Sequence, residues 1–196
     1  MTREKGREAW IARVKNGIYV SRLKYAANFD HKAVVSGIAR TYSQRGIAVK
    51  SEPSLPGGKH ADLAVSLDDE WTFIEVKTRA HNALQRRKQS SYRQDLLREI
   101  LRLRAHSLKQ LPKKESSIVV LSTSLSPSRR KAVSKIALAR SFTNRIFDHD
   151  NERILGLMIF APFKGSLPAW QYASALIPNP NLRHSDGLER LASVQL

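Results

Sequence analysis

Two short segments rich in aliphatic, aromatic and β-branched residues, 61–67 and 71–78, are separated only by Asp68, Asp69 and Glu70. Runs of that length with a short polar break between them are typical of two strands joined by a tight turn. A hairpin turn centred on Asp68 and Asp69 pairs residues whose numbers add up to 137. Because a shift of one residue would reverse both faces of each strand, this pairing constrains the fold more than any other feature of the chain.

The predicted pairing places Asp62 directly opposite Glu75, with Cβ atoms about 4.5–5.5 Å apart, and places His60 opposite Lys77. Since side chains alternate along a strand, these four residues share one face. The other face is apolar apart from one threonine and carries Ala61, Leu63, Val65, Ile74 and Val76. We expect the apolar face to pack on the core, which leaves the polar face free for chemistry.

The flanking segments predict a mixed α/β domain. Asp30 is a good N-cap for a helix over 31–44, and Pro112 ends a long helix that begins near residue 84. Apolar runs predict strands at 47–52, 118–121, 154–160 and 172–177. Residues 53–58 are expected to form a loop, and the first 27 residues are expected to be partly helical. A further helix, capped by Ser126, is predicted from about 127 to 142. The core order is therefore helix, three strands, helix, strand. Residues 1–30 form an N-terminal helical extension, 31–145 the core, and 146–196 C-terminal strands and a tail packed on it.

Charge is distributed unevenly over the 196 residues. The chain carries 34 Lys and Arg against 17 Asp and Glu, for a net charge of +17. Residues 51–80 have a net charge of −3, whereas 1–50 and 81–114 each carry +8. So large a positive excess is typical of a protein with a polyanionic partner, most often nucleic acid. A binding surface alone has no need of the acidic interruption.

Several classes of protein are excluded by composition. There is no cysteine, which excludes disulfides, a thiolate zinc site and a cysteine nucleophile. No stretch approaches 18 uncharged apolar residues, so a membrane-spanning helix is not expected. The N-terminus is basic but lacks the apolar run of a signal peptide, so we expect a cytoplasmic location.

The pair Asp62 and Glu75 has the chemistry of a metal site. Two carboxylates so close repel each other unless a cation lies between them or one is protonated. Mg²⁺ binds through one or two carboxylates together with phosphate oxygens, polarises a phosphoryl oxygen and lowers the pKa of a bound water. Lys77, two residues from Glu75, would orient the nucleophile and offset developing negative charge. This set describes metal-assisted hydrolysis of a phosphodiester.

At these residues the chain resembles the PD-(D/E)xK nuclease superfamily. Gly-Gly-Lys-His-Ala-Asp-Leu-Ala-Val (57–65) and Phe-Ile-Glu-Val-Lys-Thr (73–78) are most similar to archaeal-type Holliday junction resolvases and restriction-endonuclease-like proteins, over residues 31–123. The resemblance implies a restriction-endonuclease-like core acting on DNA. It also implies that Asp62, Glu75 and the backbone carbonyl of Val76 bind Mg²⁺, for which Mn²⁺ can substitute, and that Lys77 assists hydrolysis.

The chain departs from the family pattern at two places. Ala61 stands where the family name has proline. Many members carry a further Glu in the first core helix, whereas residues 31–46 contain no acidic residue. Glu52 or Glu8 could substitute, and His60 could reach the metal or the phosphate, although a histidine at a loop edge is also an ordinary surface residue. Gln89 lies near the helix start, where some relatives place an accessory polar residue.

A basic stripe marks the long helix. Arg98, Arg102, His106 and Lys109 fall in one arc of the helix, and the leucine-rich arc that would face the core is separate. Acidic neighbours are too few for ion pairing along the helix to explain the stripe, so phosphate contact is favoured over a merely solvated face. The expected nucleic-acid contacts are Arg86, Arg87, Lys88, Arg98, Arg102, Lys109 and Lys113.

The sequence therefore predicts a Mg²⁺-dependent endonuclease that hydrolyses phosphodiester bonds of nucleic acid, with DNA as the expected substrate. One alternative is a catalytically inactive nucleic-acid-binding protein that retains the nuclease fold. Another is a structural component of a larger nucleoprotein complex, for which the charge would also serve. Whether the chain acts as a homodimer stays open.

Overall fold

The computed structural model describes residues 17–22, 30–67, 69–78, 92–113, 115–147, 153–164 and 170–181. Its centre is a seven-stranded mixed sheet, and a two-stranded sheet lies beside it. The order in the large sheet is β1 (Tyr19–Arg22), β9 (Trp170–Pro178), β8 (Ile154–Lys164), β7 (Ser117–Ser122), β6 (Glu70–Thr78), β5 (Leu63–Leu67) and β2 (Val49–Ser51), and the small sheet consists of β3 (Ser54–Leu55) and β4 (Lys59–His60). The chain is thus a mixed α/β protein, as predicted. No helix within the described ranges is both long enough and apolar enough to cross a membrane.

The central strands and helices follow the predicted order. Helix α2 (His31–Ser43) precedes β2 (Val49–Ser51), β5 (Leu63–Leu67) and β6 (Glu70–Thr78), which are antiparallel neighbours. Helix α3 (Tyr92–Gln110) then leads into β7 (Ser117–Ser122), which runs parallel to β6. The predicted start of this helix, 84–91, lies outside the described residues. The chain continues with α4 (Arg129–Arg140), α5 (Thr143–Ile146), β8 (Ile154–Lys164) and β9 (Trp170–Pro178).

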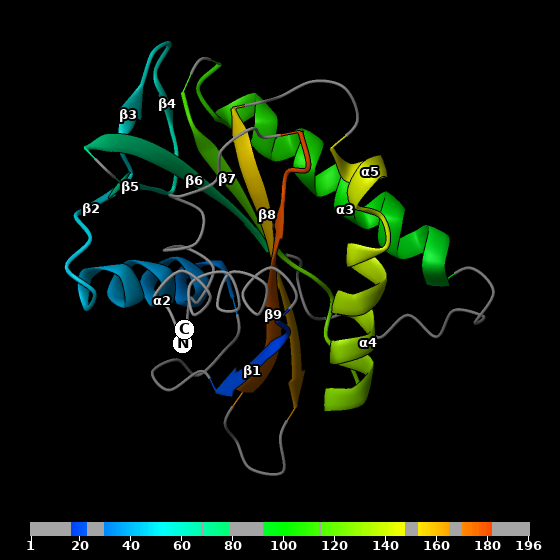
Figure 1. Ribbon diagram of the computed structural model, residues 1–196. Helices are drawn as coiled ribbons and strands as arrows, with labels where there is room; N and C mark the ends of the chain where they lie inside the picture. Colours follow the sequence, from blue (N-terminus) through cyan, green and yellow to red (C-terminus); the bar gives the residue numbers. More distant parts are fainter. Residues whose placement is uncertain are drawn as a thin grey trace, which may run out of the picture.

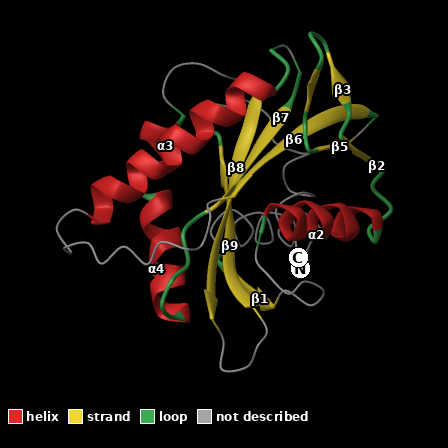
Figure 2. Ribbon diagram, turned by 180° about the vertical axis from the view of Figure 1, so that it is seen from behind, coloured by secondary structure: helices red, strands yellow, loops and turns green. Residues whose placement is uncertain are grey.

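Helices cover both faces of the sheet, with α2 on one side and α3 and α4 on the other (Figures 1 and 2). The α2 layer buries Val34, Ile38 and Tyr42 against strand residues including Leu63, Ile74 and Val76. The other layer contains Leu97 and Ile100 of α3, Ile136 of α4 and strand residues such as Phe73 and Val119. Strands β5 and β6 therefore lie between two helical layers, and polar chemistry is confined to their ends.

Local capping explains where α2 begins. Asp30 has an extended backbone, and its Oδ1 accepts a hydrogen bond from the Ala33 N–H at 2.9 Å. This contact satisfies one of the amide groups that the first helical turn leaves unpaired. The predicted cap is confirmed, and it makes His31 the first residue of the helix.

Three local predictions are wrong. The segment Tyr19–Arg22, expected to be helical, is strand β1 and pairs with β9 at the edge of the sheet, because tertiary pairing overrides a weak helical spacing. Ser128, not Ser126, caps α4 by accepting from the Lys131 N–H. Residues 53–58, expected to be a loop, contain part of a small hairpin made of β3 (Ser54–Leu55) and β4 (Lys59–His60).

Candidate active site

Asp62 lies one residue before β5, at the point where that strand and β6 separate. The register predicted for the two strands is confirmed, since Leu63 pairs with Ile74 and Leu67 with Glu70. The backbone pairing of β5 with β6 stops at the first residue of β5. Just before it, the Asp62 side chain bonds to β6 instead: its Oδ2 accepts a hydrogen bond from the Val76 N–H at 2.7 Å. The carboxylate is thereby held against β6, beside Glu75.

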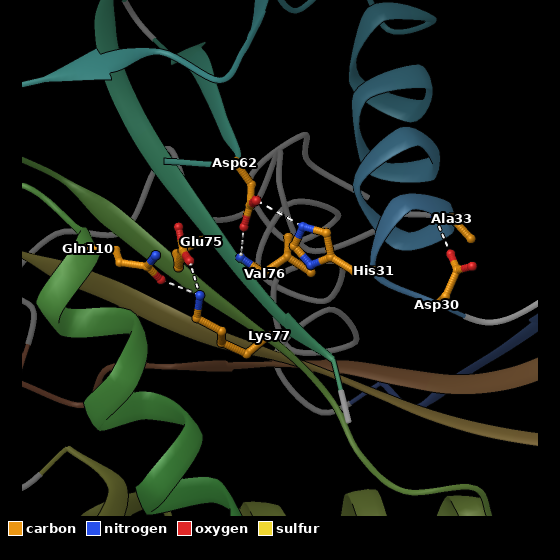
Figure 3. Close-up of polar contacts among 8 residues, drawn as sticks. All are labelled: Asp30, His31, Ala33, Asp62, Glu75, Val76, Lys77 and Gln110. Atoms are coloured by element: carbon orange, nitrogen blue, oxygen red, sulfur yellow. Dashed lines mark hydrogen bonds and ion pairs between the residues drawn. The ribbon is translucent and has the colours of Figure 1, made fainter. Parts of the chain in front are cut away.

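His31 holds the second oxygen of the same carboxylate. Its Nε2 lies 3.0 Å from Asp62 Oδ1, and because a carboxylate is an acceptor, the ring nitrogen donates. About half of the His31 side chain is exposed, against 20% of the Asp62 side chain. Asp62 is therefore oriented by two donors from different elements, the first residue of α2 and the backbone of β6 (Figure 3).

Glu75 and Lys77 form an ion pair on the face of β6 that packs against α3. The Lys77 ammonium donates to Glu75 Oε1 and also to Oε1 of Gln110, the last residue of α3. Only 3% of the Glu75 side chain is exposed, whereas a quarter of the Lys77 side chain is. Figure 3 shows these side chains converging from β6 and the end of α3. The lysine thus lies at the boundary between a buried carboxylate and solvent.

The predicted division of the strand faces is confirmed only in part. Leu63, Val65, Ile74 and Val76 pack together in the α2 layer, as expected, but Ala61 belongs to the opposite core cluster. His60 is not opposite Lys77, because it pairs with Ser54 in the separate β3-β4 sheet. The part of the predicted polar face that carries Glu75 is not open either, since α3 packs over β6 and Glu75 is buried. Access is left at the strand ends, where α3 stops.

Burial and charge both act on Glu75. Loss of solvation raises its pKa above the ordinary value, the hydrogen bond from Lys77 opposes this shift, and the charge of Asp62 adds to it. Because the two carboxylates repel each other, a cation placed between them would lower the free energy of the ionised state. Electrostatics therefore makes this pair a candidate for cation binding.

The additional ligands considered from the sequence do not join the pair. Glu52 is exposed, and its backbone N–H donates to the Asp62 carbonyl at 3.0 Å; His60 is also exposed, with Nδ1 3.5 Å from the Glu52 carbonyl. Within the described ranges, no group of three or more His, Cys, Asp and Glu side chains is arranged to hold a metal ion. Gln89 and Glu8 lie outside the described residues.

The exposed basic residues of α3 lie along the helix toward its C-terminal end, which contacts the site. Arg98, Arg102, His106 and Lys109 are exposed, while Leu97 and Ile100 of the same helix are buried. Lys109 is adjacent to Gln110, so the exposed basic face, defined here as Arg98, Arg102, His106 and Lys109, ends beside Lys77. Lys113, just past the helix, is also exposed. Arg86, Arg87 and Lys88 lie outside the described residues.

Sequence reasoning did not identify His31 or Gln110 as site residues. Each stands at a predicted helix end, His31 directly after the Asp30 cap and Gln110 two residues before Pro112. Helices packed on a sheet begin and end near the ends of strands. Polar residues at the helix ends are therefore the ones that can contact polar side chains at the strand ends, as His31 contacts Asp62 and Gln110 contacts Lys77. That position is the one signal that could have found them.

No protein-family model matches the chain, and no curated protein sequence matches it. Among solved structures, the chain is similar to one described as the structure of Pyrococcus furiosus SfsA in complex with Ca²⁺, with a TM-score of 0.33 and 17% sequence identity. The match covers 72% of this chain and 60% of that chain. A similarity at this level carries no argument about fold or chemistry, so the site must be interpreted from its own geometry.

Proposed function

We propose that the protein is a Mg²⁺-dependent endonuclease with a restriction-endonuclease-like core, acting on nucleic acid, with DNA as its substrate. The observation that carries the proposal is the grouping of Asp62, Glu75 and Lys77 where β5 and β6 separate, with the Lys77 ammonium on Glu75 and a quarter of the Lys77 side chain exposed. The order α2, β2, β5, β6, α3, β7 is the core order that the resemblance implies. The exposed basic face of α3 supplies a route for a phosphate backbone to this group.

The donor set fits a hard cation. Asp62 and Glu75 provide carboxylate oxygens, and the negative charge of Asp62 contributes to the raised pKa of Glu75. Mg²⁺ keeps several waters and needs only one or two carboxylates when a phosphate is present, so a pair suffices. When bound, the ion would polarise the scissile phosphate and lower the pKa of a water. The carbonyl of Val76 is the further ligand in this proposal.

The residues of the chain then have distinct tasks. His31 and the Val76 N–H fix the Asp62 carboxylate, so that both oxygens keep one orientation. Lys77, held between Glu75 and Gln110, presents an ammonium to the negative charge that develops on the phosphate. Arg98, Arg102 and Lys109 would bind neighbouring phosphates and set the position of the strand.

Cleavage of end-labelled single-stranded, duplex and four-way-junction DNA, in Mg²⁺ and in EDTA, tests the proposal. We expect Mg²⁺-dependent cleavage by the wild type, and a loss of at least about 100-fold in Asp62→Asn and Glu75→Gln. Glu70→Gln is the matched control, because Glu70 is exposed at the far end of the same strand. Cleavage that survives both site substitutions, or that needs no divalent cation, would rule out the assigned site.

Thermal unfolding gives a second measurement that does not depend on turnover. An ion that binds only the folded protein raises its midpoint temperature with concentration. We expect Mg²⁺ to raise the midpoint of the wild type and of Glu70→Gln, but not that of Asp62→Asn. An equal shift in all three proteins would place the ion elsewhere.

A nucleic-acid-binding protein without activity is the second candidate, favoured by the presence of only two carboxylates and no third ligand in the described part of the chain. It predicts tight, salt-sensitive DNA binding with no product on any of the three substrates. The same assay therefore separates the two candidates.

A further inference from the structure

The β3-β4 hairpin directly precedes Asp62 of the candidate site in the sequence. It leaves the sheet after β2 and returns at Asp62, and its base is closed by the hydrogen bond from the Glu52 N–H to the Asp62 carbonyl at 3.0 Å. Ser54 pairs with His60 and Leu55 with Lys59 above this base. We call residues 52–62 the site hairpin. Its C-terminal strand is separated from the Asp62 carboxylate only by Ala61.

Two anchors fix the site hairpin on the α3 side. Leu55 is 8% exposed and belongs to the same core cluster as Leu97 and Ile100 of α3. The Lys59 ammonium donates to the Lys109 carbonyl at 2.8 Å, at the C-terminal end of α3. A cation there is also stabilised by the helix dipole. The hairpin is therefore held in a defined position relative to the basic face.

The exposed part of the site hairpin suits a polyanion. Ser54 and the run from Pro56 to His60 are exposed, and no acidic residue occurs from Pro53 to Ala61. Gly57 and Gly58 at the tip have φ values of +82° and +71°, and no atom lies within 4 Å of where a Cβ would stand. A tip without side chains lets another backbone approach closely.

The site hairpin and α3 point in different directions from the site. In Figures 1 and 2 the hairpin projects past the end of the sheet, while α3 runs from its contact with Lys59 toward the opposite side of the molecule. A strand that follows the basic face to Lys77 and continues past the site therefore meets the hairpin.

We propose that the site hairpin is the second arm of the substrate grip and binds the sugar-phosphate backbone where the strand continues beyond the C-terminal end of α3. This inference rests on the proposed function and specifies its substrate: a strand that continues on both sides of the cut, as at an internal phosphodiester. Lys59 and His60 supply the basic contacts, and the glycine tip supplies close backbone approach.

Site-specific crosslinking tests the position of the arm. Because the chain has no cysteine, Ser54→Cys can carry a single photo-crosslinker, and Ser134→Cys is a matched control at an exposed serine on α4. The probes are the three labelled DNAs in EDTA, so that binding is measured without cleavage. We expect Ser54→Cys to crosslink at least about fivefold more DNA than Ser134→Cys, with equal thermal midpoints. Equal yields from the two positions would overturn the proposal.

A charge substitution tests the same contact independently. Lys59→Ala is expected to weaken DNA binding several-fold and to reduce the slope of log K against log salt by about one, as for one lost phosphate contact. Lys131→Ala, at an exposed lysine on α4, is the control and should change neither quantity. A Lys59→Ala slope equal to that of Lys131→Ala would argue against the arm.

The two proposals fail in different ways. Crosslinking from Ser54→Cys without cleavage in Mg²⁺ would keep the arm and remove the nuclease. Cleavage with no preferential crosslinking would keep the nuclease and remove the arm. Wild-type protein that binds none of the three probes would overturn both.

Discussion

Two lysines lie near the C-terminal ends of the neighbouring strands β6 and β7, and their surroundings differ. Lys77 is on β6 near its C-terminal end, with its ammonium on Glu75 and Gln110 and a quarter of its side chain exposed. Lys135 extends from α4 to Ser124, just past the end of the neighbouring parallel strand β7, and is 4% exposed. Its ammonium lies 2.6 Å from the Ser124 carbonyl and 3.4 Å from the Ser124 hydroxyl.

The difference between the two lysines is access. Solvent reaches Lys77, because the lysine lies where α3 ends and a quarter of its side chain is exposed. Nothing from solvent can approach Lys135 without opening the protein, so its role is to join the β7–α4 connection to α4. A buried lysine is therefore not by itself a sign of chemistry, whereas the proposed function gives the accessible lysine on Glu75 a role.

Replacing the accessible lysine should have the largest effect. We expect Lys77→Met to lower kcat for DNA cleavage at least about 100-fold, because the ammonium stabilises charge that develops only in the transition state. Thermal stability should also fall, because the substitution leaves the buried Glu75 carboxylate without its ion-pair partner, so the rate is expressed per folded molecule. Initial rates at saturating DNA, together with a thermal melt, measure both quantities. Undiminished cleavage by Lys77→Met would mean that Lys77, like Lys135, has no role in catalysis.

Replacing the buried lysine should affect stability instead. Lys135→Ala removes a buried stem and leaves the Ser124 carbonyl without this donor, a loss of about 2–3 kcal/mol in the free energy of unfolding. Urea unfolding measures it, with exposed Lys131→Ala as the control on the same helix, expected within about 0.5 kcal/mol of wild type. Cleavage per folded molecule should be unchanged, and a specific loss of activity would assign Lys135 to the site.

Much of this site could be predicted from the sequence because it depends on local rules. The short polar break that follows Leu67 in the sequence determines the pairing of β5 with β6, and with it the proximity of Asp62 to Glu75. The Asp30 cap determines where α2 begins. Both follow from side-chain chemistry over a few residues, so one sequence is enough to predict them.

The rest depends on how distant elements pack. The contact of His31 with Asp62 joins residues 31 apart, and that of Lys77 with Gln110 joins residues 33 apart. Strand β1 exists because β9 offers an edge, and the β3-β4 ladder has only two pairs, too few for a visible alternation. No periodicity within a short window carries such information.

The buried carboxylate should make stability depend on pH in a particular direction. Because burial raises the pKa of Glu75 above its ordinary value near 4.5, the folded state binds the proton more tightly than the unfolded chain. The contribution of Glu75 to stability is therefore complete below that ordinary value and is lost as pH rises through the folded pKa. Unfolding of wild type and Glu75→Gln in EDTA from pH 4 to 8 isolates it: wild type should lose stability relative to the variant as pH rises. The opposite trend would mean that the ion pair with Lys77 outweighs burial.

The smallest effect is expected at the residue that only positions Lys77. Gln110→Ala removes one of the two acceptors that hold the ammonium, and one hydrogen bond of about 1 kcal/mol corresponds to roughly a fivefold fall in kcat. KM should not change, because Gln110 positions the lysine and is not itself assigned a contact with DNA. Gln110→Glu keeps an acceptor oxygen and should restore most of the rate, whereas Gln94→Ala, at an exposed glutamine in the first turn of the same helix, should have no effect. If Gln110→Ala raised KM with kcat intact, the end of α3 would act on substrate directly, and the accessible lysine would owe its position to Glu75 alone.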